Sequence, residues 1–248
     1  MGKGGGPYRQ EEFLICLLAG MLEGVRSVAT GAASPIPVAA TLLASLKSNG
    51  KMTAMILGST NYGPFNDGGP ELFDRAAQGR IDVFFLGGGQ IDGRGNINLV
   101  GTGDYPRSKM RFPGSFGTPY LYSLIPRIIL FREEHSRRVL VPKVDFITAT
   151  GSGPQGAYRP GGPHALVTER AYFQYDCDAQ NFILRSTHPG HTVAEIEENT
   201  GFDFGISPSI GETLAPTPDD LKLLRSEVSV QLKDIYPEFT SQMHGPNS

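Results

Sequence analysis

Three consecutive glycines, Gly87, Gly88 and Gly89, are the residues whose type and position point most directly to chemistry. They follow the nearly all-apolar stretch 81–86, which is expected to be a buried strand. Because glycine has no side chain, the backbone N–H groups of such a turn can face a bound ligand directly. Gly87 and Gly88 are therefore a candidate oxyanion hole. An equally weighted interpretation is a structural turn in which glycine only allows the chain to leave the strand.

The polar residues after this turn are candidates for binding a substrate. Gln90, Asn96 and Asn98, together with Gly89, could contact such a ligand. Asn and Asp near glycine are first of all typical of turns in which their side chains bond to the backbone, and Asp92 is interpreted in this way. A dinucleotide phosphate loop is a poor alternative, because its spaced-glycine pattern is absent and no periodic helix follows.

A second segment, 108–117, combines cations with glycines and a serine. Lys109 and Arg111 could meet phosphates or a substrate carboxylate, although solvent-facing cations are more common. Ser115 lies in the same loop but lacks the sequence context of a nucleophile elbow. Arg111 and Ser115 are accordingly candidate binding residues, and a serine hydrolase is disfavoured because no His–Asp pair is recognisable.

The histidines and cysteines do not indicate a metal site or a disulfide framework. The only cysteines are Cys16 and Cys177, too few for either. The five histidines show no metal-ligand spacing: His135, His164, His188, His191 and His244. His188 opens a His-Pro-Gly sequence that is interpreted as a structural turn. We expect no metal and no permanently bound cofactor.

Length and composition limit the class of protein. A chain of 248 residues with 39% hydrophobic content can bury one large core, so a single domain is predicted over 1–248, with flexible ends at 1–9 and 236–248. The formal net charge is −3 and the charges are spread along the chain, which disfavours nucleic acid and acidic membranes as partners. No apolar run approaches the roughly 20 residues that span a bilayer, and the first residues lack a signal-peptide pattern. The cytoplasm is the expected compartment.

The order of the expected elements predicts the fold class. Helices are expected at 10–23, 35–46 and 72–78, and strands at 25–30, 52–57, 81–86, 127–131 and 144–148. This alternation predicts an α/β fold with an open, mainly parallel, doubly wound sheet whose ligand loops lie at the carboxyl ends of the strands. Segments 165–168, 172–175 and 182–186, separated by tight turns, predict an antiparallel C-terminal extension. Further helices are expected at 193–199 and 218–226.

Four motifs in order carry a resemblance to a known family. They are the stretch 87–98, then Gly103-Asp-Tyr, then Arg111-Phe-Pro-Gly, and finally 198–203, which reads Glu-Asn-Thr-Gly-Phe-Asp. Together they resemble the β subunit of glutaconate CoA-transferase, a class I CoA-transferase, over about residues 12 to 225. The resemblance implies a CoA-transferase-like α subunit as partner, in an αβ or α2β2 assembly, and an acyl-CoA substrate that brings coenzyme A with it. It also implies that the N–H groups of Gly87 and Gly88 bind the thioester oxygen, and that the polar candidates named above bind substrate or CoA.

One position departs from the family pattern. The transferases carry a nucleophilic glutamate, which forms a glutamyl-CoA thioester, after the strand that matches 52–57. The best match here is Ile56, a shifted register gives Gly58, and the nearest acids are Asp67 and Glu71. An aliphatic side chain cannot form the covalent intermediate.

Two branches of the family lack that glutamate. One contains steroid-ring-opening hydrolases, and the other contains methylglutaconyl-CoA decarboxylases with a cysteine at that position. This chain has no cysteine near position 56, and it has Ser115 where the hydrolases carry an arginine. The resemblance therefore predicts a β-type subunit of a heteromeric enzyme that cleaves a C–C bond of an acyl-CoA through an oxyanion or enolate. A genuine CoA-transferase and a non-catalytic CoA-binding partner are the alternatives.

Overall fold

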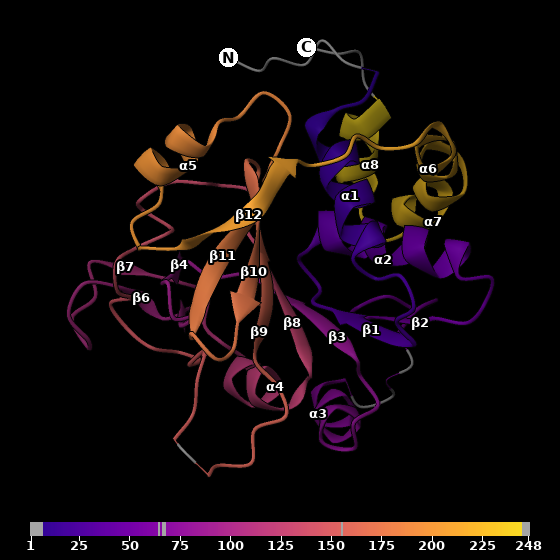
Figure 1. Ribbon diagram of the computed structural model, residues 1–248. Helices are drawn as coiled ribbons and strands as arrows, with labels where there is room; N and C mark the ends of the chain where they lie inside the picture. The colour runs from indigo at the N-terminus through magenta and orange to yellow at the C-terminus, as the bar shows by residue number, and fades with distance from the viewer. Residues whose placement is uncertain (1–6, 64, 66–67, 155, 245–248) are drawn as a thin grey trace. The chain divides into compact units, whose positions relative to one another are not determined.

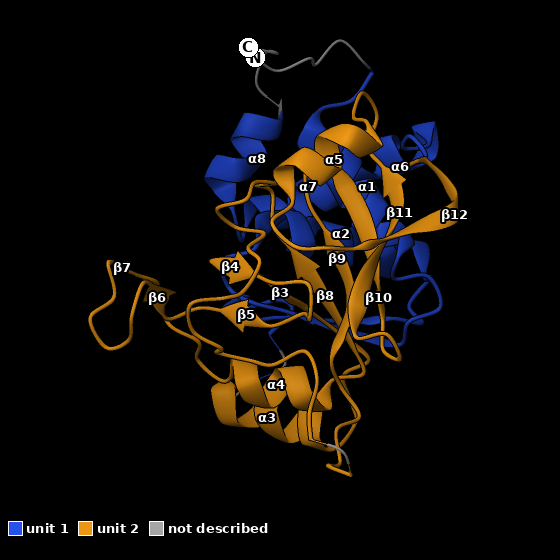
Figure 2. Cartoon of the chain, turned by 60° about the vertical axis from the view of Figure 1, so that its left-hand side comes forward, with its two compact units in different colours: residues 1–68, 214–248 blue, residues 69–213 orange. Residues whose placement is uncertain are grey.

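The computed structural model describes residues 7–63, 65, 68–154 and 156–244 (Figure 1). The chain divides into two compact units, which Figure 2 colours separately: Met1–Gly68 with Leu214–Ser248, and Gly69–Thr213. We call these unit 1 and unit 2. The single domain over 1–248 and its flexible ends stay predictions. Of the described residues, no helix is long and apolar enough to cross a membrane.

Unit 1 combines one parallel strand pair with helices from both ends of the chain. Its strands are β1 (Ser27–Thr30) and β2 (Thr53–Ile56), paired in parallel register. Its helical segments are α1 (Gln10–Gly20), α2 (Pro35–Lys47), α6 (Pro218–Leu223), the π-helical turn Leu224–Val228, α7 (Ser229–Lys233) and α8 (Pro237–His244). The predicted helices at 10–23, 35–46 and 218–226 are thus confirmed within a few residues.

An ion pair between a buried carboxylate and an exposed arginine joins the two ends of the chain within unit 1. Arg225 donates to both carboxylate oxygens of Glu12, at 2.6 and 2.7 Å, and the Glu12 side chain is only 3% exposed. The backbone N–H of Arg9 donates to the same carboxylate. Burial raises the pKa of Glu12, but the hydrogen bonds and charge of Arg225 outweigh it, so the pKa is lowered overall.

Unit 2 contains a mixed sheet in the order β12-β11-β10-β9-β8-β3. The strands are β3 (Val83–Leu86), β8 (Arg127–Phe131), β9 (Pro163–Val167), β10 (Ala171–Asp176), β11 (Asn181–Thr187) and β12 (Gly205–Glu212). β3, β8 and β9 are parallel, β9, β10 and β11 form an antiparallel meander, and β12 lies parallel to β11. The α/β class, the mainly parallel strands and the antiparallel segment are as predicted.

The remaining elements of unit 2 are short. The helices are α3 (Gly69–Ala77), α4 (Thr118–Leu124) and α5 (Val193–Asn199). Two ribbons complete it, β4 (Gln90–Ile91) with β5 (Ile97–Asn98), and β6 (Gly101–Thr102) with β7 (Met110–Arg111). α5 has the predicted bounds, because Thr192 caps it by accepting a hydrogen bond from the Glu195 N–H.

Three differences from the sequence prediction have physical reasons. The segment 144–148 is not a strand, since its N–H groups bond instead to the loop after β3, for example Asp145 to the Gln90 side chain at 2.9 Å. β12 was not predicted because it is an edge strand that contains Gly and Pro and is exposed on most positions, so it lacks an apolar period. α4 was not predicted because it has only 7 residues inside a glycine- and proline-rich stretch.

Two buried histidines tie β9, β11 and α5 together at one end of unit 2. His135 bonds through its two ring nitrogens to the hydroxyls of Thr168, at 2.8 Å, and Thr200, at 3.0 Å. His188 bonds to the Thr213 hydroxyl and to the Thr168 carbonyl, both at 3.0 Å. Burial lowers the pKa of each histidine to about 4. His188 lies immediately before a turn at 189–190, as predicted.

Candidate functional site

The glycine turn, residues 87–89, begins where β3 ends. Gly87 is exposed, Gly88 is buried, and the Gly89 N–H donates to the Asn98 carbonyl at 2.9 Å. By contrast, neither the Gly87 nor the Gly88 N–H donates a hydrogen bond to another described residue. Two adjacent N–H groups at the end of this strand thus have no partner among the described residues, and free backbone donors are one requirement of an oxyanion hole.

Close packing explains why the turn needs glycine. A Cβ atom on Gly88 would lie 2.8 Å from the Gln90 carbonyl oxygen and 3.0 Å from the Ile91 side chain. A Cβ atom on Gly89 would lie 2.3 Å from the ring of Phe112. At Gly87 the nearest neighbour, the Phe131 carbonyl oxygen, would be 3.4 Å away, so a methyl group fits there. Close packing therefore requires glycine at positions 88 and 89, whereas position 87 has room for a small side chain.

A buried amide network fixes the loop after the turn. The Asn98 side-chain amide donates to the Gln90 side-chain oxygen and to the Gly101 carbonyl, both at 2.7 Å. The Gln90 amide donates to Asp145 at 3.2 Å, and the same Asp145 oxygen accepts the Gly103 N–H at 2.8 Å. Gln90 is 6% exposed and Asn98 is fully buried. Their polar groups are therefore used within the protein, and a role in ligand binding stays a prediction.

Asp92 and Asn96 form a second buried pair beside this network. Asp92 accepts the Arg94 and Asn96 N–H groups, each at 3.1 Å, and the Asn96 side-chain amide at 3.0 Å. The Asn96 oxygen in turn accepts the Gly151 N–H at 3.1 Å. The interpretation of Asp92 as a turn residue is confirmed, and ligand contact by Asn96 stays a prediction.

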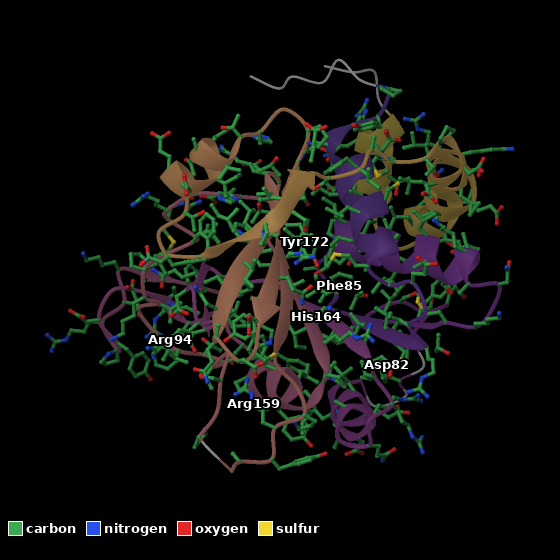
Figure 3. All side chains as sticks on the ribbon, viewed as in Figure 1. Asp82, Phe85, Arg94, Arg159, His164 and Tyr172 are labelled. Atoms are coloured by element: carbon green, nitrogen blue, oxygen red, sulfur yellow. The ribbon has the colours of Figure 1, made fainter. Side chains whose placement is uncertain are left out.

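Two tyrosine hydroxyls hold the outer part of the same loop. Tyr122 donates to the Gly95 carbonyl at 2.6 Å, and Tyr175 donates to the Arg94 carbonyl at 2.9 Å. Burial raises the pKa of Tyr122 well above its usual value and that of Tyr175 to about 12, so both keep the proton they donate. Arg159 lies over the Tyr122 ring at 5.8 Å, and Figure 3 labels Arg94 and Arg159.

Sequence reasoning did not identify Asp145, Tyr122 or Tyr175 as supports of this loop. Asp145 is 55 residues from Gln90 along the chain, so only the folded chain brings them together. The available signal was an acidic residue inside the apolar stretch 144–148, which is unusual for a buried strand.

The other candidates of unit 2 lie on its surface. Arg111, at the end of β7, is exposed, donates to the Pro106 carbonyl at 3.1 Å and lies 5.9 Å from the centre of the Tyr105 ring. Ser115 is half-buried, and its carbonyl accepts the Thr118 N–H at the start of α4. In the part of the chain that the structure describes, no histidine or carboxylate is hydrogen-bonded to the Ser115 hydroxyl, so the serine is not set up as a nucleophile.

Ile56 ends β2 in unit 1 and is fully buried. Its N–H donates to the Tyr62 carbonyl at 2.8 Å, and its carbonyl accepts the Ser59 N–H at 3.2 Å. Residues 57–63, which we call the β2 turn, thus fold back on the strand. Of the two acids nearest in sequence, Asp67 lies outside the described residues, and Glu71 lies in the first turn of α3, 3.7 Å from Arg75.

No metal centre is formed by the described residues, since they contain no cluster of three or more His, Cys, Asp or Glu side chains that could hold an ion. His135 and His188 are bonded to threonines, and His191 bonds to Glu195 at 3.1 Å. Cys16 and Cys177 are free thiols.

The family pattern of the coenzyme A transferases matches residues 30–199. The chain belongs to this family.

Three relatives show how the family varies. The chain is 38% identical over 154 residues to a 3-oxoadipate CoA-transferase subunit of Pseudomonas knackmussii, which covers 60% of this chain and 59% of that protein. It is 35% identical over 153 residues to a glutaconate CoA-transferase subunit of Acidaminococcus fermentans, covering 59% and 56%. It is 30% identical over 159 residues to the cholesterol ring-cleaving hydrolase IpdB subunit of Rhodococcus jostii, covering 62% of each. The matched stretch thus spans less than two thirds of each relative.

A solved structure matches more of the chain. The decarboxylase AibA/AibB superposes with a TM-score of 0.76 at 25% identity, covering 96% of this chain and 99% of that one. The fold therefore extends over nearly the whole chain.

Proposed function

We propose that the chain is the β-type subunit of a heteromeric enzyme that cleaves a C–C bond of an acyl-CoA substrate without a glutamyl-CoA intermediate. The observation that carries this proposal is the contrast between two strand ends. The glycine turn keeps two unused N–H donors, whereas the residue that the family resemblance aligns with the nucleophilic glutamate is the buried Ile56.

The unused donors fit a reaction in which negative charge develops on the thioester oxygen. In hydrolytic cleavage, water adds to a ketone two carbons from the thioester, and the C–C bond breaks with its electron pair on the thioester side. The hydroxyl remains on the new carboxylic acid, and the enolate then takes a proton at carbon. In a decarboxylation the departing CO2 leaves its electron pair to the same enolate. Two N–H groups at Gly87 and Gly88 would stabilise this charge in either case.

The proton-transfer group is proposed to come from an α-type partner. The glycine turn itself offers only backbone donors, and Gln90, Asp92 and Asn96 are used within the protein. The names of the relatives describe subunits, and the decarboxylase is named as a pair of chains. Activity of this chain without a partner would contradict the assignment.

The test combines product analysis with covalent trapping. The chain, purified with an α-type partner, is incubated with a β-ketoacyl-CoA or carboxyacyl-CoA, and the products are separated by mass spectrometry. Cleavage products are expected, with solvent oxygen incorporated only where the reaction is a hydrolysis. Hydroxylamine or borohydride added during turnover should leave every glutamate of this chain unmodified. A modified glutamate, Glu71 included, would contradict the proposal.

A genuine CoA-transferase is the second candidate, and it is favoured by the identity of 38% and 35% to two transferase subunits. Transfer requires a carboxylate nucleophile in one of the chains. The same trapping experiment separates the two, because a transferase forms a glutamyl adduct and exchanges labelled CoA between carboxylic acids, while the cleaving enzyme does neither. A complex that turns over without any contribution from the glycine turn would instead identify this chain as a non-catalytic partner.

A further inference from the structure

We propose that unit 1 contains a second ligand site, a pocket at the C-terminal ends of α1 and α2 that binds an organic anion with an apolar body. The pocket has a volume of about 510 Å³, and small-molecule sites span roughly 300–1,000 Å³. All its lining residues come from two stretches, 19–26 and 44–51. We call it the helix-end pocket. Neither stretch contains a residue that the proposed function uses, so the inference is independent of that function.

The helix-end pocket lies at the amino edge of the parallel strand pair of unit 1. α1 and α2 lie side by side (Figure 1), and each is followed by a turn that leads into the next strand. β1 begins at Ser27 and β2 begins at Thr53, whereas the β2 turn follows the carboxyl end of β2. A strand of this length separates its two ends by roughly 10–13 Å. A ligand in the pocket is therefore held away from the edge at which Ile56 lies.

The two turns that form the pocket are fixed by their own backbone. Gly24 has a φ of +74° and Asn49 a φ of +51°, the left-handed conformation in which glycine and asparagine commonly end a helix. The Val25 N–H donates to the Leu22 carbonyl at 3.1 Å, and the Asn49 N–H donates to the Leu46 carbonyl at 3.2 Å. The pocket is thus formed before a ligand binds, which lowers the entropy cost of binding.

The inner wall of the pocket is apolar. It is lined by the buried side chains of Ala19, Leu22, Val25 and Ala44. Gly20, the last residue of α1, also lines it, and a Cβ atom there would have no heavy atom of the described residues within 4 Å. The missing side chain leaves room beside an apolar surface. An apolar ligand body fits this wall because contact with it removes apolar surface from water.

Positive charge surrounds this wall. Arg26, Lys47 and Lys51 line the pocket and are exposed. Among the described residues that line it, Glu23 is the one acid, and Lys47 pairs with Asp220 at 2.5 Å. Three cations and these two acids leave a formal charge of +1 around the pocket, which favours an anion.

The combination of cavity, apolar wall and cations sets the class of ligand. Lysine near a helix C-terminus also stabilises the helix dipole, but that role requires neither a cavity nor an apolar wall. A carboxylate or sulfonate accepts charge-assisted hydrogen bonds from lysine and arginine. The ligand is accordingly an anion whose charged group lies among the exposed cations while its hydrocarbon or ring contacts the buried wall.

The test uses two fluorescent probes that differ in one group. 8-Anilinonaphthalene-1-sulfonate is an organic anion, and N-phenyl-1-naphthylamine is the same ring system without the sulfonate. The Kd of each is measured by fluorescence titration of the full chain, together with its α-type partner where one co-purifies. Excess coenzyme A is present to occupy any thioester site. Both probes should bind, the anion severalfold more tightly.

Two kinds of variant separate the apolar wall from the charge. Gly20→Leu fills the open space and should raise the Kd of both probes about tenfold. Its matched control is Gly211→Leu in unit 2, where a Cβ atom likewise meets no described heavy atom within 4 Å, and it should change neither Kd. Lys51→Ala should raise the Kd of the anion about threefold and leave that of the neutral probe unchanged. Lys143→Ala, at an exposed lysine of unit 2, is the control for charge.

Three outcomes would overturn the inference. The first is a native chain that binds neither probe in the presence of coenzyme A. The second is an unchanged Kd of both probes in a folded Gly20→Leu, which would place them elsewhere on the protein. The third is an equal change for both probes in Lys51→Ala and in the Arg26→Ala, Lys51→Ala double variant, whose exposed positions leave the core intact. None of these results bears on the proposed function, because that function is tested by product analysis.

Discussion

The β2 turn of unit 1 and the glycine turn of unit 2 both follow the carboxyl end of a short parallel strand. In the β2 turn the strand end itself is bonded, since Ile56 bonds to Tyr62 and Ser59, and the N–H of the next residue, Leu57, donates to the Thr30 carbonyl at 3.1 Å. In the glycine turn two successive N–H groups donate to no described residue. The two strand ends therefore differ at the first residue after the strand, whose N–H is bonded at Leu57 and donates to no described residue at Gly87.

The difference shows what an enzyme family can change while it keeps its fold. A nucleophile is a single side chain, and its replacement by isoleucine needs only an apolar environment, which the end of β2 supplies. The glycine turn is a backbone conformation whose following loop is held by Gln90, Asn98 and Asp145, so altering it would disturb several hydrogen bonds at once. On the proposed function, a covalent step is thus easier to lose than a backbone site for the thioester oxygen.

The largest effect is expected when a carboxylate is placed at the end of β2. Ile56→Glu should destabilise the chain by roughly 3–5 kcal/mol in chemical denaturation, because the new charge has no partner at a fully buried position. It should also fail to form a glutamyl-CoA adduct on hydroxylamine trapping. Ile56→Val is the control and should cost about 1 kcal/mol. If Ile56→Glu created an active transferase, the end of β2 would be able to hold a catalytic carboxylate, and the contrast between the two turns would be wrong.

The glycine turn is tested by removing one N–H group. Gly87→Pro should lower kcat by about 100- to 1,000-fold, since proline has no N–H to donate to the developing oxyanion. Gly87→Ala keeps the N–H, and its methyl group has 3.4 Å of room, so the activity should stay within severalfold of native. Steady-state kinetics of both variants measure the contribution of the Gly87 N–H to kcat, and their unfolding midpoints check that both variants fold. Equal losses in the two variants would exclude a specific role for the N–H.

The support of the glycine turn is tested through its buried amide. Asn98→Ala should lower the free energy of unfolding by about 2–3 kcal/mol, because the Gln90 oxygen, the Gly101 carbonyl and the Val100 N–H each lose a hydrogen bond to the Asn98 side chain. Asn61→Ala, in the β2 turn, removes an exposed side chain and should change stability by no more than about 0.5 kcal/mol. Urea denaturation measures both. If the two substitutions were equivalent, the network would not hold the turn.

Lowering the pH should destabilise unit 2 more than unit 1. The folded-state pKa of His135 and His188 is about 4, below the usual 6.5, so the unfolded chain binds more protons between these values and stability falls as the pH is lowered. Each histidine removes about 1.4 kcal/mol per pH unit in that window. In unit 1 the pKa of Glu12 is lowered from 4.5, so its contribution is lost only below that pH.

Hydrogen exchange measured at pH 7 and pH 5, and corrected for the slower intrinsic exchange at the lower pH, should therefore show smaller protection factors for peptides from 69–213 at pH 5, with little change in 10–47. His188→Gln, which keeps a polar side chain but does not titrate, should reduce the pH dependence by the contribution of one of the two histidines. An equal response of both units would contradict the assignment of the acid sensitivity to the two histidines.

Much of the architecture was determined by local sequence. The helices that begin at Gln10, Pro35, Val193 and Pro218 and the strands around residues 83–86 and 127–131 follow from apolar period, capping residues and proline placement, all of which act over a few residues. The glycine turn and the absence of a carboxylate at position 56 were likewise visible in the sequence, because the first is a composition signal and the second is a single residue.

What the sequence could not determine depends on contacts between distant residues. Asp145 meets Gln90 across 55 residues, and Tyr175 meets Arg94 across 81, so no local pattern predicts that the polar residues of the loop are used to hold it. The apolar stretch 144–148 is not the expected strand for the same reason, because its N–H groups bond to the loop after β3. The sequence by itself determined which groups are present at the site. Only the tertiary structure decided which of them are already bonded, because the side chains of the loop found their partners in remote parts of unit 2, while the N–H groups of Gly87 and Gly88 bond to no described residue.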